Sequence, residues 1–184
     1  RRDPNRLDMA LVTAEKTCVA AGTFTTNRFC AAPVTVSREH AADGRARAVI
    51  LNSGNANAAT GEPGLQTARK TAELVAKSLG CEANDVLVAS TGVIGVPLPF
   101  APYEEGVPAA IRALGSDAAA AHDAAVAVMT TDTVPKEASF QAEVEATDGS
   151  AYTVHVGGFV KGSGMIHPNM ATMLCVLSTD APLT

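Results

Sequence analysis

The chain has 184 residues, of which 47% are hydrophobic and 18% charged, so its composition is that of a folded globular protein rather than a disordered or fibrous one. The net charge of −5 and the scattered Lys and Arg residues argue against a nucleic-acid partner, because no basic run is available to contact a phosphate backbone. No apolar stretch reaches the ~20 residues that a membrane-spanning helix needs, so we expect no membrane partner.

The first half of the chain is expected to contain strands and one long helix. Residues 7–14 and 18–24 predict two short strands of a hairpin that turns at Glu15 and Lys16. Three further elements are predicted from apolar runs or helical spacing: strands at 46–51 and 85–89, and between them a helix at 65–79 that Gly80 ends.

The second half is expected to begin with an irregular connection, because residues 97–108 contain four prolines and should form at most one helical turn. Helices are predicted at about 107–114 and at 117–129. Residues 137–146 and 152–160 alternate with a period of two about a turn, which predicts a hairpin, and residues 173–177 predict a last strand.

The order of these elements predicts the fold class. Strands and helices mix without strict alternation, which favours a layered α/β fold with a mixed or antiparallel sheet over a doubly wound one. No repeat, low-complexity tract or charge run marks a linker, so residues 1–184 are expected to form one α/β domain.

The four cysteines, Cys18, Cys30, Cys81 and Cys175, are irregularly spaced and include no CxxC pair. The four histidines show no ligand spacing relative to them, so we expect no metal site. Such cysteines are most often reduced thiols in a cytoplasmic protein. The basic residues at 1–6 have no apolar segment behind them, which argues against a signal peptide. We therefore expect a cytoplasmic location.

Two glycine- or hydroxyl-rich segments are candidate site elements. Thr91 and Gly92 follow a predicted buried strand, where backbone N–H groups could converge on one point as an oxyanion hole requires. An ordinary glycine turn is the alternative, since short motifs of this kind are common. Thr130 belongs to a run of three hydroxyls and one carboxylate (residues 130–133) at the end of a predicted helix, which is either a solvated loop or a polar wall of a substrate site.

A third segment, residues 161–174, contains a lysine, a glycine-rich turn and a threonine before an apolar run. Lys161 is either an ordinary surface lysine or an ammonium that pairs with a substrate carboxylate. Thr172 is either a strand threonine or a nucleophile. A threonine hydroxyl is a weak nucleophile without a base beside it, and cleavage of the Ala171–Thr172 bond would supply that base as a free α-amine.

Four segments together resemble the ornithine acetyltransferase family, the bifunctional glutamate N-acetyltransferases of arginine biosynthesis. They occur in family order over nearly the whole chain: AVILNSGNANA (48–58), STGVIG (90–95), MTTDTVPK (129–136), and KGSGM (161–165) with PNMATML (168–174). The last is the most specific.

The resemblance implies a layered αββα sandwich of the N-terminal-nucleophile type and an enzyme that cleaves itself at Ala171–Thr172. Thr172 would then carry the acetyl group from N2-acetyl-L-ornithine to L-glutamate. Thr91 and Gly92 would form the oxyanion hole, and Thr130 and Lys161 would contact the amino-acid substrate. No resident cofactor or metal is implied, and acetyl-CoA as a second acetyl donor is left open.

The family precursor is considerably longer, so the chain resembles its amino-terminal half, the α chain. Residues 172–184 would then belong to the start of the β chain, which would complete the site in an αβ heterodimer that assembles to a heterotetramer. Two alternatives remain: an N-terminal-threonine aminopeptidase or amidase with water as acceptor, and an inactive fragment that needs its β chain.

Overall fold

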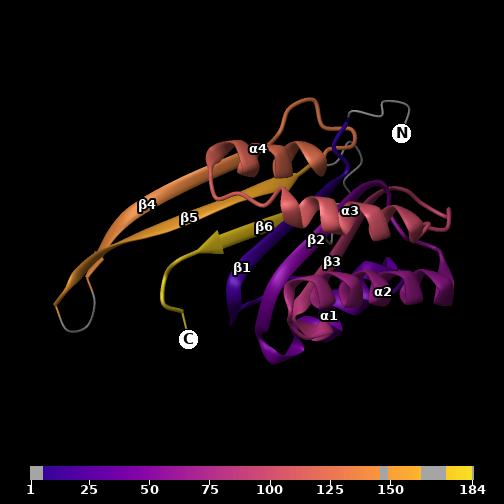
Figure 1. The fold of residues 1–184 in the computed structure, drawn as a ribbon, viewed down its shortest axis with the longest axis horizontal. Coiled ribbons are helices and arrows are strands. Elements are labelled where there is room, and N and C mark those ends of the chain that lie inside the picture. The colour runs from indigo at the N-terminus through magenta and orange to yellow at the C-terminus, as the bar shows by residue number, and fades with distance from the viewer. Residues whose placement is uncertain (1–5, 146–148, 163–172, 184) are drawn as a thin grey trace.

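The computed structural model describes residues 6–145, 149–162 and 173–183, and these form two three-stranded sheets with four α-helices (Figure 1). In the first, mixed sheet, β1 (Met9–Val19) runs antiparallel to β2 (Arg45–Asn55), and β2 runs parallel to β3 (Val86–Val93). The second sheet is antiparallel throughout, with the strand order β4-β5-β6. Its strands are β4 (Glu137–Glu145), β5 (Ala151–Lys161) and β6 (Leu174–Thr179). The predicted combination of mixed and antiparallel sheets is confirmed.

Three helices cover one face of the mixed sheet: α1 (Ala32–His40), α2 (Gly61–Leu79) and α3 (Ala101–Arg112). Two short 3-10 turns, η1 (Ala41–Asp43) and η2 (Ala83–Asp85), lead into β2 and β3. The first core fills the space between these helices and the sheet, and its members are Val36, Ala48, Ile50, Ala68, Ala72, Val75, Ala76, Val86, Val88, Tyr103 and Val107. One face of strand β2 lies in this first core and the opposite face is also buried, so the strand carries apolar residues on both faces.

That other face forms a second core with the antiparallel sheet and α4 (Ala118–Ala127). Ala10 and Leu51 from the mixed sheet lie in this core with Phe159 from β5. Ala125, Ala127 and Val128 enter it from the end of α4. The described molecule is therefore a stack of helices, mixed sheet and antiparallel sheet, and α4 packs against β1 of the first sheet and β4 and β5 of the second.

The structure corrects one expectation in the first half and shows one helix that was not predicted. Residues 7–24 do not form a hairpin, since β1 is a single strand whose two parts both pair with β2. Glu15 and Lys16 lie where the register shifts between Thr13 and Cys18, so they occupy a bulge instead of a turn. Helix α1 was not predicted, and its residues Val34-Thr35-Val36 have a β-branched composition that is more typical of a strand.

The prolines of residues 97–108 also led to a wrong prediction, because these residues run into a twelve-residue helix, α3. Pro102 lies in the first turn, where a missing N–H group is harmless. Pro108 lies inside the helix, but Tyr103 and Val107 are 4% and 0% exposed in the first core, and this burial keeps the segment helical. The helix after it and the hairpin of β4 and β5 are confirmed, and the last strand, β6, forms at 174–179.

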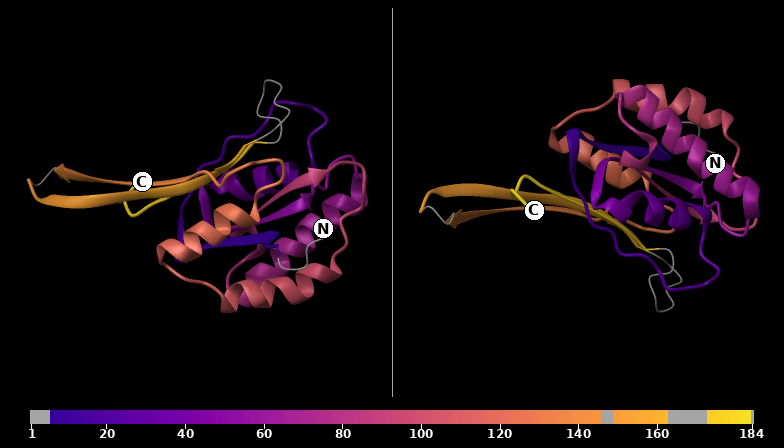
Figure 2. Two further views of the ribbon diagram at one scale, coloured as in Figure 1. Left: turned by 90° about the horizontal axis from the view of Figure 1, so that it is seen from above. Right: turned by 90° about the horizontal axis from the view of Figure 1, so that it is seen from below.

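The antiparallel sheet has one face without cover in the described part of the chain. Strands β4 and β5 extend well beyond the mixed sheet (Figures 1 and 2). By register, alternate residues on them lie on the face opposite Phe159, which belongs to the second core. We call this the apolar face of β4–β6; its side chains, which the register places opposite Phe159, are Ala138, Phe140, Ala142, Val144, Tyr152, Val154, Val156, Val160, Cys175 and Leu177. Phe140 and Leu177 are each 70% exposed.

Three further observations concern the cysteines, the helices and the possible metal ligands. The four cysteines are free. Across the described ranges, no helix combines the length and the apolar character that crossing a membrane requires. Within the same ranges, no group of three or more His, Cys, Asp and Glu side chains could hold a metal ion.

Candidate functional site

Thr91 lies near the end of β3, on the face of the mixed sheet that turns toward the antiparallel sheet. It is paired in register with Ser53 of the parallel strand β2, and the alternate residues Leu51 and Ala89 on this face belong to the second core. Thr91 is 1% exposed, and its hydroxyl oxygen has no hydrogen-bond partner in the described part of the chain. A buried polar group without a partner is unfavourable by about 1–3 kcal/mol, which points to a role outside the fold itself.

Gly92 follows with a backbone conformation that requires glycine. Its φ is +133°, and a Cβ atom there would lie 2.3 Å from the carbonyl carbon of Gly54 on β2. The register of β2 and β3 shifts at Gly54 and Asn55, so the two strands approach closely where the ladder ends. The backbone of Gly92, the residue after Thr91, is therefore fixed by this close approach to β2.

Ser53 links this strand end to helix α4. Its hydroxyl donates a hydrogen bond of 2.6 Å to the carbonyl of Ala127, the last residue of the helix. Both residues are buried. Thr130 follows three residues later, so this contact sets where the hydroxyl-rich segment leaves the helix.

Asp132 accepts hydrogen bonds from two segments of the chain. Its Oδ2 accepts from the Thr130 N–H group at 3.3 Å, and its Oδ1 accepts from the Gly162 N–H group at 2.9 Å and from Lys136 Nζ at 2.7 Å. The side chain is only 2% exposed. Burial alone would raise the pKa of Asp132, but these three hydrogen bonds and the nearby charge of Lys161 outweigh it and lower the pKa.

Lys161, the last residue of β5, is 1% exposed, which excludes the alternative of a surface lysine. Its Nζ donates to the carbonyl of Gly162 and lies 3.9 Å from Asp132 Oδ2. Burial lowers the pKa of Lys161, and the carboxylate of Asp132 opposes that effect. A buried ammonium with one carboxylate near it is suited to a second anionic partner, such as the carboxylate of an amino acid.

These contacts bring the predicted residues into two connected groups. Ser53, which is paired with Thr91, links the strand end that carries Thr91 and Gly92 to α4. Asp132 accepts a hydrogen bond from Thr130 and lies near the ammonium of Lys161. Ala171 and Thr172, the predicted cleavage site and nucleophile, lie outside the described residues, so the nucleophile stays a prediction.

Comparison with known proteins identifies the family. The sequence model of the ArgJ family matches residues 1–184. The chain belongs to the ArgJ family. It is 47% identical over 180 residues to the arginine biosynthesis bifunctional protein ArgJ of Geobacter sulfurreducens, an alignment that covers 98% of this chain and 44% of that protein. It is 54% identical over 162 residues to the ArgJ protein of Bifidobacterium longum, which covers 88% of this chain and 39% of the relative. The chain thus spans less than half the length of these ArgJ proteins.

Solved ArgJ structures have the same fold. The chain superposes on ArgJ of Bacillus halodurans with a TM-score of 0.76 at 38% identity, covering 92% of this chain and 85% of the other. The same values hold for the ornithine acetyltransferase of Mycobacterium tuberculosis complexed with ornithine. The predicted family and the predicted N-terminal-nucleophile type of α/β fold are therefore confirmed.

Two residues of this candidate site were not found from the sequence. Asp132 was noticed only as one member of a polar run, and Ser53 carried no signal beyond its position in a turn-rich segment. Their partners lie 30 and 74 residues away, and only the packing of α4 against both sheets brings them together. A carboxylate flanked by threonines directly after a buried helix end was the one signal that could have indicated Asp132.

Proposed function

We propose that the complete protein transfers an acetyl group from N2-acetyl-L-ornithine to L-glutamate in arginine biosynthesis. Membership of the ArgJ family, with a relative named as an ornithine acetyltransferase and solved with ornithine, carries this proposal. The unpaired Thr91 hydroxyl supports it independently, because a buried donor without a partner is what a developing oxyanion needs.

The proposed reaction has two steps through an acetyl-threonine intermediate. After cleavage of Ala171–Thr172, the Thr172 hydroxyl attacks the acetyl carbonyl while its own α-amine takes the hydroxyl proton. The C–N bond to ornithine then breaks, and the ornithine amine leaves with that proton. The α-amine of glutamate next attacks the acetyl ester and forms a C–N bond. The ester C–O bond breaks, and the proton that the glutamate amine loses passes through the Thr172 α-amine to the threonine oxygen, which restores the hydroxyl.

The described residues fit the supporting roles in this scheme. The Thr91 hydroxyl and the Gly92 N–H group would stabilise the oxyanion in both steps, and such a donor typically contributes about 3–4 kcal/mol to transition-state stabilisation. Thr130 and the buried Lys161 would bind the amino-acid substrate. No step requires a metal or a resident cofactor. Acetyl-CoA as a second donor stays a prediction.

We further propose that the carboxyl-terminal part of the polypeptide, as a β chain, covers the apolar face of β4–β6 in an αβ heterodimer that assembles to a heterotetramer. The size and apolar character of this face support the pairing, as does the length of the relatives. Residues 172–184 would then open the β chain, although β6 pairs with β5. A cytoplasmic location fits the free cysteines.

The test uses the complete polypeptide and a Thr172→Ala variant. Wild type is expected to give two chains, and after incubation with N2-acetyl-ornithine alone the second chain should gain an ester-linked acetyl group, a mass increase of about 42 Da. The variant is expected to remain one chain without transfer activity. Normal turnover by the variant would disprove the nucleophile.

Two outcomes would support the alternatives. Release of free acetate at the same rate with and without glutamate would indicate an amidase that uses water as acceptor. Absence of activity even when the chain is produced together with its carboxyl-terminal part would favour a non-catalytic fragment.

A further inference from the structure

Asp132 joins the two residues that are proposed to bind the substrate. Thr130 leaves the end of α4, whereas Lys161 ends β5, and no backbone ladder connects these two positions. The Asp132 carboxylate bridges them, with one oxygen on the Thr130 N–H group and the other on the Gly162 N–H group. Its side chain is 2% exposed, so water does not compete for these bonds.

We propose that Asp132 is a positioning residue that sets the place of Thr130 relative to Lys161 and so determines the affinity for the amino-acid substrate. This inference rests on the proposed function, in which Thr130 and Lys161 contact that substrate. Asp132 itself need not touch the substrate, since its oxygens already face the two amides and the two lysines.

The charge of Asp132 matters as well as its shape. Lys161 is 1% exposed, and burial disfavours its ammonium form. Asp132 Oδ2, at 3.9 Å from Lys161 Nζ, favours that form, while Lys136 binds the other oxygen. Asparagine has the size of aspartate but only one acceptor oxygen, so its NH2 group would face at least one of the donors that the carboxylate now binds.

Replacing Asp132 should have different effects depending on whether its carboxylate only stabilises the fold or also positions the substrate-binding residues. Loss of a structural bond lowers the melting temperature without a selective effect on substrate binding. Loss of positioning raises KM for the amino acid while kcat changes little, because the displaced groups bind ground state and transition state alike.

The experiment compares Asp132→Asn with an Asp43→Asn control in the complete polypeptide. Asp43 is an exposed carboxylate that accepts a local hydrogen bond from the Arg45 N–H group, so the control makes the same chemical change away from the site. Three quantities are measured: KM and kcat for glutamate and N2-acetyl-ornithine, hydrogen exchange of peptides that contain Thr130 and Gly162, and the melting temperature. We expect a KM increase of about tenfold or more with kcat within about threefold, together with faster exchange in both peptides. The control should match wild type.

Wild-type KM in a folded Asp132→Asn variant, with or without a lower melting temperature, overturns the proposal. If that variant does not fold, Asp132→Glu keeps the charge and both acceptor oxygens but displaces them, and wild-type KM in this variant overturns the proposal equally. If wild type itself transfers no acetyl group, the proposed function fails, and the exchange measurement decides alone: faster exchange at both amides supports the bridge, and unchanged exchange overturns it.

Discussion

The Ser53 hydroxyl donates a hydrogen bond of 2.6 Å to the carbonyl of Ala127 and thereby ties the end of β2 to the last residue of α4. Thr91 lies beside Ser53 in the ladder, and Thr130 follows Ala127 in the chain. This contact therefore relates the proposed oxyanion site to the proposed substrate site.

Replacing Ser53 by Ala should destabilise the protein by about 1–3 kcal/mol, because the buried Ala127 carbonyl loses its side-chain donor. We also expect slower acetyl transfer, since the segment that begins at Thr130 loses an anchor. Denaturant unfolding and steady-state kinetics of the complete polypeptide measure the two effects. Ser78→Ala is the matched control: its hydroxyl bonds the Leu74 carbonyl on the exposed side of α2, so a change within about 0.5 kcal/mol is expected. Equal stability of the two variants would contradict the prediction.

Replacing Thr91 by Val should separate function from stability. Valine has nearly the same shape and removes only a buried hydroxyl that has no partner in the described structure, so stability should be unchanged or slightly higher. If the hydroxyl stabilises the oxyanion, kcat for acetyl transfer should fall by about 10²–10³-fold. The measurement is kcat together with the unfolding midpoint.

Thr91→Ser provides the control for this variant. It keeps the hydroxyl and loses a methyl group, so it should be less stable than wild type by about 1 kcal/mol and should retain most of its activity. The oxyanion role is wrong if Thr91→Val turns over as fast as Thr91→Ser.

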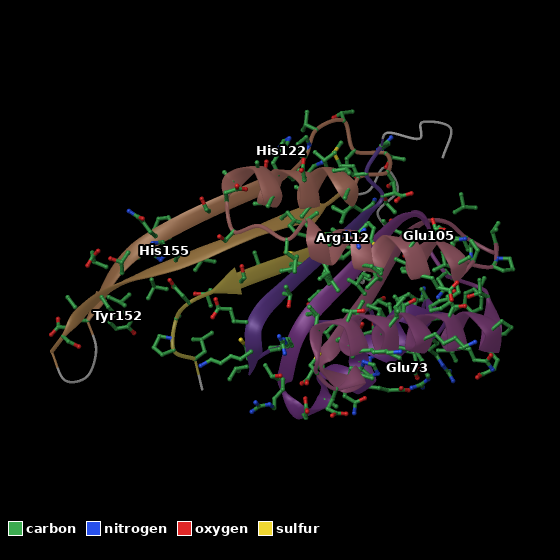
Figure 3. The ribbon with its side chains drawn as sticks, viewed as in Figure 1. Glu73, Glu105, Arg112, His122, Tyr152 and His155 are labelled. Carbon is green, nitrogen blue, oxygen red and sulfur yellow. The ribbon has the colours of Figure 1, made fainter. Side chains whose placement is uncertain are left out.

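Replacing Phe140 by Asp should weaken the association of the two proposed chains. Phe140 is 70% exposed on the apolar face of β4–β6. Figure 3 shows Tyr152, on the same face, toward the end of the β4–β5 hairpin that lies away from the mixed sheet. A carboxylate buried there without a partner should reduce affinity by about 100-fold or more, so the cleaved chains should no longer purify together. Gln141→Asp changes the next residue, which points to the opposite face, and should leave the pair intact. Dissociation of both variants to the same extent would show that this face is not the specific contact.

The stabilisation of the folded protein by His122 should decrease as the pH rises. His122 lies on α4 (Figure 3), and its Nδ1 is 2.5 Å from Oε1 of Glu137, the first residue of β4. The hydrogen bond to Glu137 and its charge raise the pKa of His122 above 6.5 in the folded protein. The resulting stabilisation is fully present below pH 6.5 and disappears as the pH rises through the raised pKa.

The variant His122→Gln should therefore be less stable than wild type at about pH 5.5 and equal to it at about pH 9, as thermal unfolding at a series of pH values would measure. Glu137→Gln should likewise be less stable than wild type at low pH and equal to it at high pH, because this variant removes the other partner of the ion pair. A difference that grows with pH would contradict the assignment.

Two predictions from the sequence were wrong, and each has a physical reason that particular residues show. Glu15 and Lys16 were expected to form a turn, but both parts of β1 gain more from pairing with β2 than from folding back on each other. Residues 101–112 contain prolines that argue against a helix, but the burial of Tyr103 and Val107 outweighs that local preference. Local propensity is a weak guide wherever a segment packs against a distant one.

The amino-acid order by itself determined the family, the layered α/β class, the hairpin of β4 and β5, and the positions of Thr91, Gly92, Thr130 and Lys161 as candidates, because these depend on local motifs and periodicity. Only the tertiary structure decided that Lys161 is buried, that the Thr91 hydroxyl has no partner in the described part of the chain, and that Asp132 and Ser53 connect the candidates. Burial and hydrogen bonding between residues 30 to 74 positions apart depend on how sheets and helices stack, and that information is not present in any local stretch of the chain.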